Sequence, residues 1–317
     1  EYKKAGSCKV LIVTGCMAQR YKNEIIEEVP EVDAVLGTTS YGDILKAINE
    51  AMEGKHFEEF KDIDYLPEKL GKRVLTTGGH FGYLKIAEGC DKHCTYCIIP
   101  KLRGKFRSVP MERLLEQAKE MAEEGVKELI LVAQETTVYG TDIYGKKSLH
   151  ILLKELCKIK GIRWIRVLYC YPEEIYDELI QTMKEEKKIC HYLDLPIQHA
   201  SDRILKRMGR RTTQAELVAI VNKLRQEIPD IVLRTTLISG FPGETQEDHE
   251  HIQEAEWDEH VWTSPINAAK ISRVLADTFA QKDRVREEKY DGYQVSDNQI
   301  SMKVPACSIV LLRIEAR

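Results

Sequence analysis

Three cysteines stand within eight residues of this chain, in the stretch EGCDKHCTYC. Cys90, Cys94 and Cys97 are spaced by four and three residues, and thiolates select zinc, copper(I) or iron–sulfur clusters. A structural zinc site needs four ligands, usually from two close pairs, and no second pair follows downstream. His93 adjoins Cys94, so these two side chains diverge and do not easily share a metal. Three cysteines on one loop instead suit a cubane cluster that leaves one iron open for a further ligand.

The composition bounds the class of protein that carries these thiols. The chain has 317 residues, of which 43% are hydrophobic, which is enough for a large core or two domains. Its net charge of −4 provides no global basic field for nucleic acid. We expect no membrane span, because no apolar run reaches about 18 residues, and no signal peptide. The odd count of nine cysteines argues against a disulfide framework and favours a reducing cytoplasm. Cys157, Cys170 and Cys190 stand alone in helix or strand patterns, so we expect them to be buried small hydrophobes.

A series of strands and helices begins near residue 80 and must position the three thiols. Five apolar runs read as strands with helical patterns between them: YLKIAEG, ELILVAQ, RWIRVLYC, HYLDLPIQ and IVLRTTLISG. Strands that alternate with helices pair in parallel through right-handed crossovers. The sequence therefore predicts an α/β fold with a full or partial (β/α) barrel, and five or six strands are too few for the eight-stranded form. Thr213 and Glu216 form a possible capping box at the start of the last helix.

Unusual residues follow each of these five strands. The cysteines follow the first strand, AQETT the second, CYP the third, LPIQH the fourth and SGFPGE the fifth. The active sites of parallel βα folds lie at the carboxyl ends of their strands. The sequence therefore predicts one functional site at that edge of the sheet.

A smaller α/β unit precedes this series. KVLIVTG and VDAVLGT read as strands, and helical patterns cover residues 17–29 and 41–54. The pattern is lost from 56 to 79, where charges, Pro67 and a Gly-Gly pair indicate a linker. The expected organisation is therefore an N-terminal unit over 1–55, a linker over 56–79, a core over 80–256 and a divergent tail over 257–317.

The cysteine spacing in this context resembles the radical S-adenosylmethionine (SAM) superfamily, with the aromatic Tyr96 before the last cysteine. The resemblance implies a [4Fe–4S] cluster on Cys90, Cys94 and Cys97, whose open iron is chelated by the amine and carboxylate of S-adenosylmethionine. It also implies an electron donor of the flavodoxin or ferredoxin type. One electron then cleaves the sulfonium to a 5′-deoxyadenosyl radical, while the protein orients and shields the cofactor.

Longer stretches are similar to the methylthiotransferases within that superfamily. They are TGCMAQRY, AEGCDKHCTYCIIPKLRGKFRS, AQETTVYGTDIYG, LPIQHASDRILKRMGRRTT and LRTTLISGFPGET. The third stretch resembles the branch that methylthiolates an aspartate β-carbon on protein twelve of the small ribosomal subunit, with Glu135 in place of the usual aspartate. The branch that modifies tRNA adenosine is the alternative, although it typically reads Gly-Gln-Asn-Val-Asn at this point. A non-catalytic fragment that binds a cluster or a partner is a third hypothesis. The implied fold is a partial (β/α) barrel of the radical SAM type, preceded by part of a small α/β N-terminal domain.

The resemblance also implies roles for single residues around the cofactor. Tyr96 would lie near the adenine, Gln134, Glu135 and Thr136 match the segment that binds the methionyl amine, and Arg210 matches a position that pairs with the methionyl carboxylate. Gln198 could read ribose hydroxyls, and Gly240 and Gly243 would allow close backbone approach to a ligand.

Each of these roles has a plainer alternative. Glu135 could be a solvated strand end, and Arg210 could belong to a solvated basic face with Lys206, Arg207 and Arg211. His199 is as consistent with a structural cap as with a ligand contact, and a tight turn explains Gly240 and Gly243 nearly as well.

Two further features bear on partners and on a second cluster. PKLRGKFRS carries four basic residues beside the cysteines and would form an electropositive rim for a ribosomal protein, although Val109 stands where the family commonly has arginine. The family binds a second [4Fe–4S] cluster through three N-terminal cysteines, of which Cys16 matches only the third. Cys8 matches neither of the others. We therefore expect this chain as given to lack a stable second cluster, and the tail to contain no recognisable C-terminal β-barrel.

Overall fold

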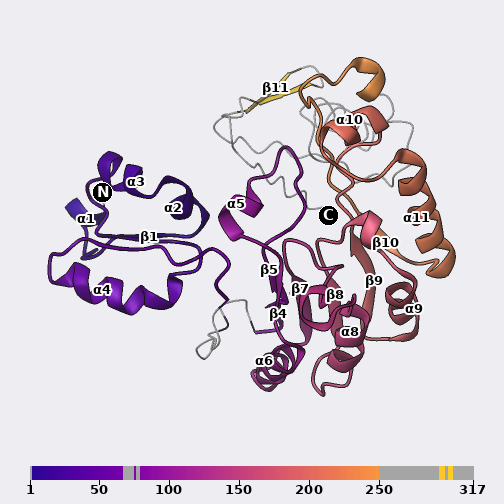
Figure 1. Ribbon diagram of the computed structural model, residues 1–317, viewed down its shortest axis with the longest axis horizontal. Coiled ribbons are helices and arrows are strands. Elements are labelled where there is room, and N and C mark those ends of the chain that lie inside the picture. The colour runs from indigo at the N-terminus through magenta and orange to yellow at the C-terminus, as the bar shows by residue number, and fades with distance from the viewer. Residues whose placement is uncertain (1, 67–74, 76–78, 250–292, 297–298, 303–317) are drawn as a thin grey trace.

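The computed structural model describes residues 2–66, 75, 79–249, 293–296 and 299–302. Two parallel sheets organise these residues, one of three strands and one of five (Figure 1). The five-stranded sheet contains the strands that the sequence predicts. Of the helices among these residues, none is both long and apolar enough to cross a membrane.

The N-terminal unit is built around the sheet β1-β2-β3, whose strands all run parallel. Its elements are α1 (Tyr2–Ala5), β1 (Ile12–Thr14), α2 (Cys16–Tyr21), α3 (Asn23–Glu28), β2 (Ala34–Leu36), the 3-10 turn η1 (Tyr41–Asp43), α4 (Ile44–Met52) and β3 (Phe57–Glu59). Ala18, Val32 and Val35 pack on one side of this sheet, and Ala34, Leu36 and Ala47 on the other.

The structure corrects the sequence analysis at two points in this unit. The single helix expected over 17–29 is two short helices, because Lys22 between them has a φ of 41°. A non-glycine residue rarely adopts that left-handed conformation. The region assigned to the linker also contains β3, which pairs with β2 from Phe57 to Glu59. A three-residue strand with two acidic residues gives too little apolar pattern to be recognised from sequence.

The core is a five-stranded parallel sheet with the order β10-β9-β8-β7-β4. The elements from residue 80 onward are β4 (Phe81–Lys85), β5 (Ala87–Glu88), α5 (Ile99–Arg103), β6 (Arg107–Ser108), α6 (Met111–Glu123), β7 (Glu128–Val132), α7 (Thr141–Tyr144), α8 (Leu149–Cys157), β8 (Trp164–Val167), η2 (Pro172–Glu174), α9 (Asp177–Glu185), β9 (Ile189–Asp194), α10 (Asp202–Arg207), α11 (Gln214–Glu227) and β10 (Val232–Arg234). All five predicted strands are therefore confirmed, in chain order across the sheet. The partial barrel is confirmed with them.

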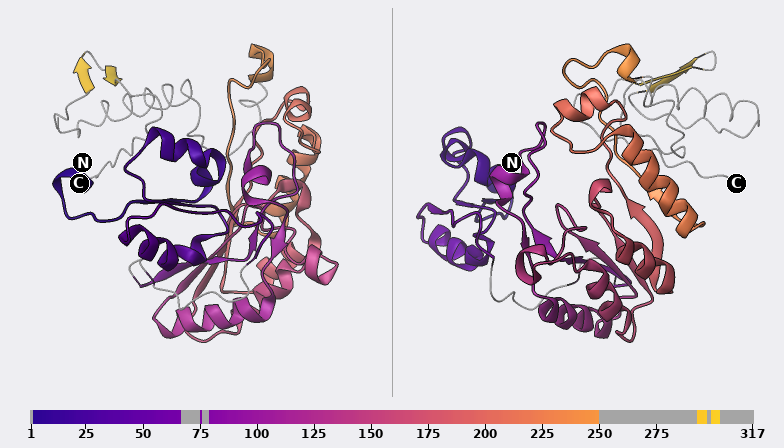
Figure 2. Two further views of the ribbon diagram at one scale, coloured as in Figure 1. Left: turned by 60° about the vertical axis from the view of Figure 1, so that its left-hand side comes forward. Right: turned by 45° about the vertical axis from the view of Figure 1, so that its right-hand side comes forward.

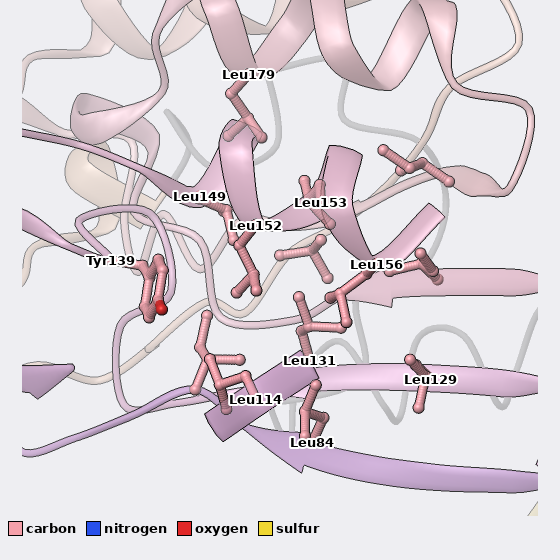
Figure 3. Close-up of a cluster of buried hydrophobic side chains, with 14 of the residues drawn as sticks. Leu84, Leu114, Leu129, Leu131, Tyr139, Leu149, Leu152, Leu153, Leu156 and Leu179 are labelled. Atoms are coloured by element: carbon pink, nitrogen blue, oxygen red, sulfur yellow. The ribbon is translucent and has the colours of Figure 1, made fainter. Parts of the chain in front are cut away.

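The long helices α6, α8, α9 and α11 cover one face of this sheet (Figures 1 and 2). Leucines from the helices interdigitate with leucines of β4 and β7, and the close-up in Figure 3 shows Leu149, Leu152, Leu153 and Leu156 of α8 above Leu84, Leu129 and Leu131. Each of these side chains is 0% exposed. Burying one such side chain contributes about 1.5–3 kcal/mol, so this layer holds the strand ends in place. The expected burial of Cys157 and Cys170 is confirmed, while Cys190 is half-buried.

The predicted capping box starts α11. Thr213 Oγ1 accepts a hydrogen bond from the Glu216 backbone N–H at 3.3 Å, and the Glu216 carboxylate accepts from the Thr213 N–H at 2.8 Å. Leu217, Val221 and Leu224 then form the buried stripe of the helix.

The helix α5 joins the two units. Thr38 Oγ1 donates to the Leu102 carbonyl at 2.9 Å, and Arg103 Nε donates to Cys16 Sγ at 3.1 Å. Arg107 forms an ion pair with Asp64 at 3.2 Å. Arg103 thus links the two units, and Arg107 is paired with the segment that connects them, so only part of the expected electropositive rim of four basic residues is exposed. Lys101 and Lys105 alone of the four are exposed.

The described part of the tail is one antiparallel pair, β11 (Tyr293–Ser296) with β12 (Gln299–Met302). The remaining residues of the predicted tail lie outside the described residues.

Candidate functional site

The loop with the three cysteines follows β5 and is fixed first at Gly89. Gly89 has a φ of 79°, and a Cβ atom there would lie 2.1 Å from the carbonyl oxygen of Lys105. Only glycine fits, because any side chain would collide with that backbone. The Gly89 N–H donates to Gln134 Oε1 at 2.8 Å, and the Cys90 N–H donates to the Gly104 carbonyl at 3.2 Å.

The other end of the loop rests on the turn between α10 and α11. The Thr95 N–H donates to the Met208 carbonyl at 3.0 Å, and Thr95 Oγ1 donates to the Arg207 carbonyl at 3.0 Å. A Cβ atom at Gly209 would lie 3.0 Å from the His93 carbonyl oxygen. The loop is therefore held between residues 104–105 and 208–209, which are far apart in the sequence.

All three thiols of the loop are free, with Cys90 and Cys94 buried and Cys97 half-buried. Burial raises the pKa of the Cys90 thiol to about 11, and the nearby carboxylate of Glu135 adds to this rise. Among the described residues, no three His, Cys, Asp or Glu side chains converge on a position for a single metal ion. A cluster spreads its thiolates over several irons, so it does not require such convergence.

Glu135 is a buried carboxylate without a cation in hydrogen-bond contact. It is 2% exposed, which rules out the solvated strand end, and its Oε1 has no hydrogen-bond partner. Burial raises the pKa of Glu135 to about 7, although Lys92 opposes this rise. A buried charge is stable only when it is paired. Glu135 therefore offers one unfilled contact to a cationic group beside Cys90.

The two neighbours of Glu135 already have partners. Gln134 Oε1 holds the Gly89 N–H, and Thr136 Oγ1 donates to the Leu168 carbonyl at 2.8 Å while its side chain is 0% exposed. Each of these two hydrogen bonds connects the segment after β7 to the segment that follows a neighbouring strand. Their predicted contact with the methionyl amine stays a prediction, and Glu135 is the member of the segment with a free buried acceptor.

Arg210 lies near Cys94, the second cysteine of the loop. Its side chain is 1% exposed, so it does not belong to a solvated basic face, in contrast to the exposed Lys206, Arg207 and Arg211. Arg210 Nη2 pairs with Glu173 at 3.0 Å, whereas its Nε has no hydrogen-bond partner. Arg210 therefore retains one buried donor for an anionic group.

The remaining predicted residues have fewer contacts that bear on a ligand. Tyr96 is half-exposed beside Cys94 and Arg210. Gln198 has a φ of 71° and bridges to Leu237 through its backbone, and Gly240 has a φ of 78° with open space around it. The proposed contacts of all three with adenine, ribose or ligand stay predictions. Gly243 has a φ of 82°, which side chains rarely adopt, so the tight turn explains that glycine structurally.

His199 acts as a structural cap. Its Nδ1 accepts the Ser201 N–H at 2.9 Å just before α10, and its Nε2 lies 3.6 Å from Glu244 Oε1. The side chain is 0% exposed, and burial lowers its pKa. His199 therefore lies between the loops that follow β9 and β10, and its hydrogen bond is to the start of α10.

Tyr171 is not among the predicted site residues, although it lies in the segment CYP that follows the third predicted strand. The Tyr171 hydroxyl lies 3.1 Å from Cys94 Sγ, and the Arg210 guanidinium carbon lies 4.2 Å from the centre of its ring. Tyrosine is common in cores, so residue type alone gave no signal.

Cys16, the expected ligand of a second cluster, begins α2 and is half-buried. Its Sγ accepts the hydrogen bond from Arg103 Nε. The expectation that this chain lacks a stable second cluster stays a prediction.

The arrangement fits an amino-acid zwitterion beside a cluster. Glu135 Oε1 is a buried acceptor near Cys90, and Arg210 Nε is a buried donor near Cys94. An ammonium and a carboxylate on one ligand would satisfy both atoms, while the three thiols would hold iron.

Comparison with known proteins agrees with this class of site. Residues 84–255 match the family model of the radical SAM superfamily, which is more than half of the chain. The solved structure of OxsB, a cobalamin-dependent S-adenosylmethionine radical enzyme with aqua-cobalamin and S-adenosylmethionine bound, is similar with a TM-score of 0.52. That likeness covers 76% of this chain and 38% of OxsB at 14% identity, so it shows the fold alone.

Similarity to curated relatives narrows the assignment within the radical SAM superfamily. The chain is 68% identical over 254 residues to the ribosomal protein uS12 methylthiotransferase RimO of Lachnoclostridium phytofermentans, covering 80% of this chain and 58% of the relative. It is 50% identical over 309 residues to RimO of Clostridium botulinum strain Eklund 17B, covering 95% of this chain and 68% of the relative. The chain belongs to the RimO family of the radical SAM superfamily. It spans about three-fifths of the length of most of these relatives, for example 58% and 62%.

Proposed function

We propose that this chain forms the radical-generating part of a methylthiotransferase that adds a methylthio group to the β-carbon of an aspartate in ribosomal protein uS12. The name shared by the relatives supports this substrate, and so does the AQETT segment with Tyr139-Gly140 and Asp142 to Gly145. Modification of tRNA adenosine is not favoured, since these relatives are all uS12 methylthiotransferases. We place the reaction in the cytoplasm, with a flavodoxin- or ferredoxin-type electron donor.

The observation that carries the proposal is a pair of buried atoms without hydrogen-bond partners, Glu135 Oε1 near Cys90 and Arg210 Nε near Cys94. When bound, a [4Fe–4S] cluster and S-adenosylmethionine supply a 5′-deoxyadenosyl radical, which can remove hydrogen from an unactivated carbon. Cys90, Cys94 and Cys97 would hold the cluster. Glu135 would accept hydrogen bonds from the methionyl ammonium, and Arg210 would donate to the methionyl carboxylate.

Two features of the chain would prepare these residues for their roles. The contacts of Gly89 with Gln134 and with residues 104–105 fix the loop before any ligand arrives, which lowers the entropic cost of binding. Burial of Glu135 raises its pKa to about 7, so arrival of an ammonium would favour the charged carboxylate and release a proton.

The first experiment tests the amino-acid contact. A contact of this kind contributes roughly 1.5–3 kcal/mol, so Glu135→Gln should weaken S-adenosylmethionine binding about 10- to 100-fold in the anaerobically reconstituted protein. Glu135→Asp should retain most of the affinity. 5′-Methylthioadenosine, which lacks the amino-acid group, serves as the control ligand and should bind both proteins equally. Unchanged binding of S-adenosylmethionine by Glu135→Gln would contradict the assignment of Glu135.

The second experiment tests the substrate. The reduced protein is incubated with a uS12 peptide that carries deuterium on the β-carbon of its target aspartate. We expect deuterium in the 5′-deoxyadenosine product, because the radical must take hydrogen from the carbon that will bear sulfur. A tRNA anticodon stem-loop is the parallel substrate. Deuterium transfer from a labelled adenosine, with none from the peptide, would overturn the choice of substrate.

A further inference from the structure

The segment Tyr171–Glu174 makes three separate contacts with the cofactor-binding residues. Tyr171 contacts Cys94, Glu173 pairs with Arg210 at 3.0 Å, and Glu174 pairs with Lys92 of the cysteine loop. Glu174 also pairs with Lys147 at 2.9 Å. This segment follows β8, so the central part of the sheet supports it.

The backbone fixes the direction of the Tyr171 side chain. Pro172 follows it and restricts Tyr171 to extended conformations, as its φ of −81° and ψ of 125° show. The Tyr171 N–H donates to Thr137 Oγ1 at 3.0 Å, and Thr137 is 0% exposed. Tyr171 therefore projects from a rigid attachment at the ends of β7 and β8.

The Tyr171 side chain is held at both its ring and its hydroxyl. Lys92 Nζ and the Arg210 guanidinium carbon lie 5.2 and 4.2 Å from the ring centre, and cations at such distances are attracted to the ring. Its hydroxyl lies 3.1 Å from Cys94 Sγ. Either atom could be the donor in a thiol–phenol contact, but a sulfur bonded to iron has no proton to give. In the loaded protein, the hydroxyl must therefore be the donor.

We propose that Tyr171 is a positioning residue that donates a hydrogen bond to the Cys94 sulfur and thereby raises the reduction potential of the cluster. This inference rests on the proposed function, because it requires a cluster on Cys90, Cys94 and Cys97. Reduction adds a negative charge to the cluster and its thiolates. A hydrogen-bond donor stabilises that more negative state, and hydrogen bonds to the sulfurs are among the features that set the potential of such clusters.

The test compares two tyrosine-to-phenylalanine variants in the reconstituted protein. Tyr171→Phe removes the hydroxyl and keeps the ring against Lys92 and Arg210. Tyr176→Phe is the matched control: its ring also has a lysine over it, Lys147 at 5.4 Å, but its hydroxyl lies 3.0 Å from His150 Nδ1 rather than from a sulfur. Iron content, S-adenosylmethionine affinity and the midpoint potential are measured for both.

We expect Tyr171→Phe to hold as much iron as the parent and to bind S-adenosylmethionine within about twofold. Its equilibrium constant for reduction should fall about tenfold, which is a shift of about 59 mV to a more negative potential for one electron. Tyr176→Phe should leave the potential unchanged. A role of Tyr171 in packing alone would not move the potential while iron and affinity are preserved.

Each other outcome separates this inference from the proposed function. If the parent protein itself binds no cluster, the proposed function fails. If the parent binds the cluster and Tyr171→Phe has the same potential, the inference about Tyr171 is wrong and the proposed function stands. Loss of iron in Tyr171→Phe alone would also overturn the inference, because the hydroxyl would then be required for assembly rather than for tuning.

Discussion

The outer face of the five-stranded sheet and its carboxyl-terminal edge differ in how their buried side chains are satisfied. On the outer face, leucines of α6, α8 and α9 fill the space above β4, β7 and β8. At the edge, buried polar atoms of Glu88, Glu135, Asp194 and Arg210 have no hydrogen-bond partner. None of the described residues in α6, α8, α9 and α11 has such an atom.

This difference indicates that the helical layer needs no further binding partner, whereas the carboxyl-terminal edge of the sheet does. A buried polar atom that lacks a partner costs roughly 1–3 kcal/mol, so several of them at one edge mark a region that requires further hydrogen-bond partners from water or from a ligand. The helical layer provides the stability that offsets this cost. We therefore expect substitutions at the edge to change ligand binding with little loss of stability, and substitutions in the helical layer to do the opposite.

The largest expected effect separates two kinds of buried cysteine. Replacement of Cys90, Cys94 and Cys97 together by alanine should abolish iron binding and the broad absorbance of the cluster, since no thiolate remains on the loop. Cys157→Ala on α8 is the control and should keep the full iron content, because that thiol lies in the helical layer. Iron and sulfide analysis after anaerobic reconstitution measures both. Iron retained by the triple variant would refute the cluster assignment.

The next effect concerns the helical layer. Leu153 is 0% exposed within the α8 cluster, so Leu153→Ala should lower the free energy of unfolding by about 2–5 kcal/mol. Leu45→Ala is the matched control, because Leu45 is 72% exposed and its loss should change stability by less than about 0.5 kcal/mol. Urea denaturation measures the change. At temperatures where Leu153→Ala remains folded, its affinity for S-adenosylmethionine should equal that of the parent.

The third effect is the pH dependence that Glu135 gives to the cofactor-free protein. Its pKa rises from 4.5 to about 7 on folding, so between these values the folded state binds more protons than the unfolded state. Stability must then fall as the pH rises from about 4.5 to 7, by roughly 3 kcal/mol at most, since one unit is about 1.36 kcal/mol. Glu135→Gln should flatten that part of the profile. Parallel pH profiles of the parent and the variant, measured by urea denaturation, would show that Glu135 is not desolvated.

The contrast between the apolar layer and the polar edge also explains how much of the structure could be predicted from the sequence. Apolar runs located all five strands of the core, because buried parallel strands leave a contiguous apolar pattern in the sequence. The rule that functional residues follow the carboxyl ends of parallel strands located Glu135 and the three cysteines. The partner of a side chain has no such pattern: the pairing of Arg103 with Cys16 crosses 87 positions and that of Tyr171 with Cys94 crosses 77. β3 was missed for a related reason, since three residues carry too little periodicity.

The smallest expected effect tests whether the helical layer and the carboxyl-terminal edge of the sheet are energetically independent at a point where residues of both are near each other in the sequence. Thr213, three residues after Arg210, caps α11 through Glu216. Thr213→Ala removes the acceptor for the Glu216 N–H and should lower the free energy of unfolding by about 1 kcal/mol. Thr213→Ser keeps the hydroxyl and should cost much less. Arg210 is held by Glu173 and by the ring of Tyr171 rather than by the cap, so affinity for S-adenosylmethionine should remain within about twofold in both variants. If Thr213→Ala instead weakened binding about tenfold, the start of α11 would be part of what positions Arg210, and the helical layer and the carboxyl-terminal edge would be energetically coupled.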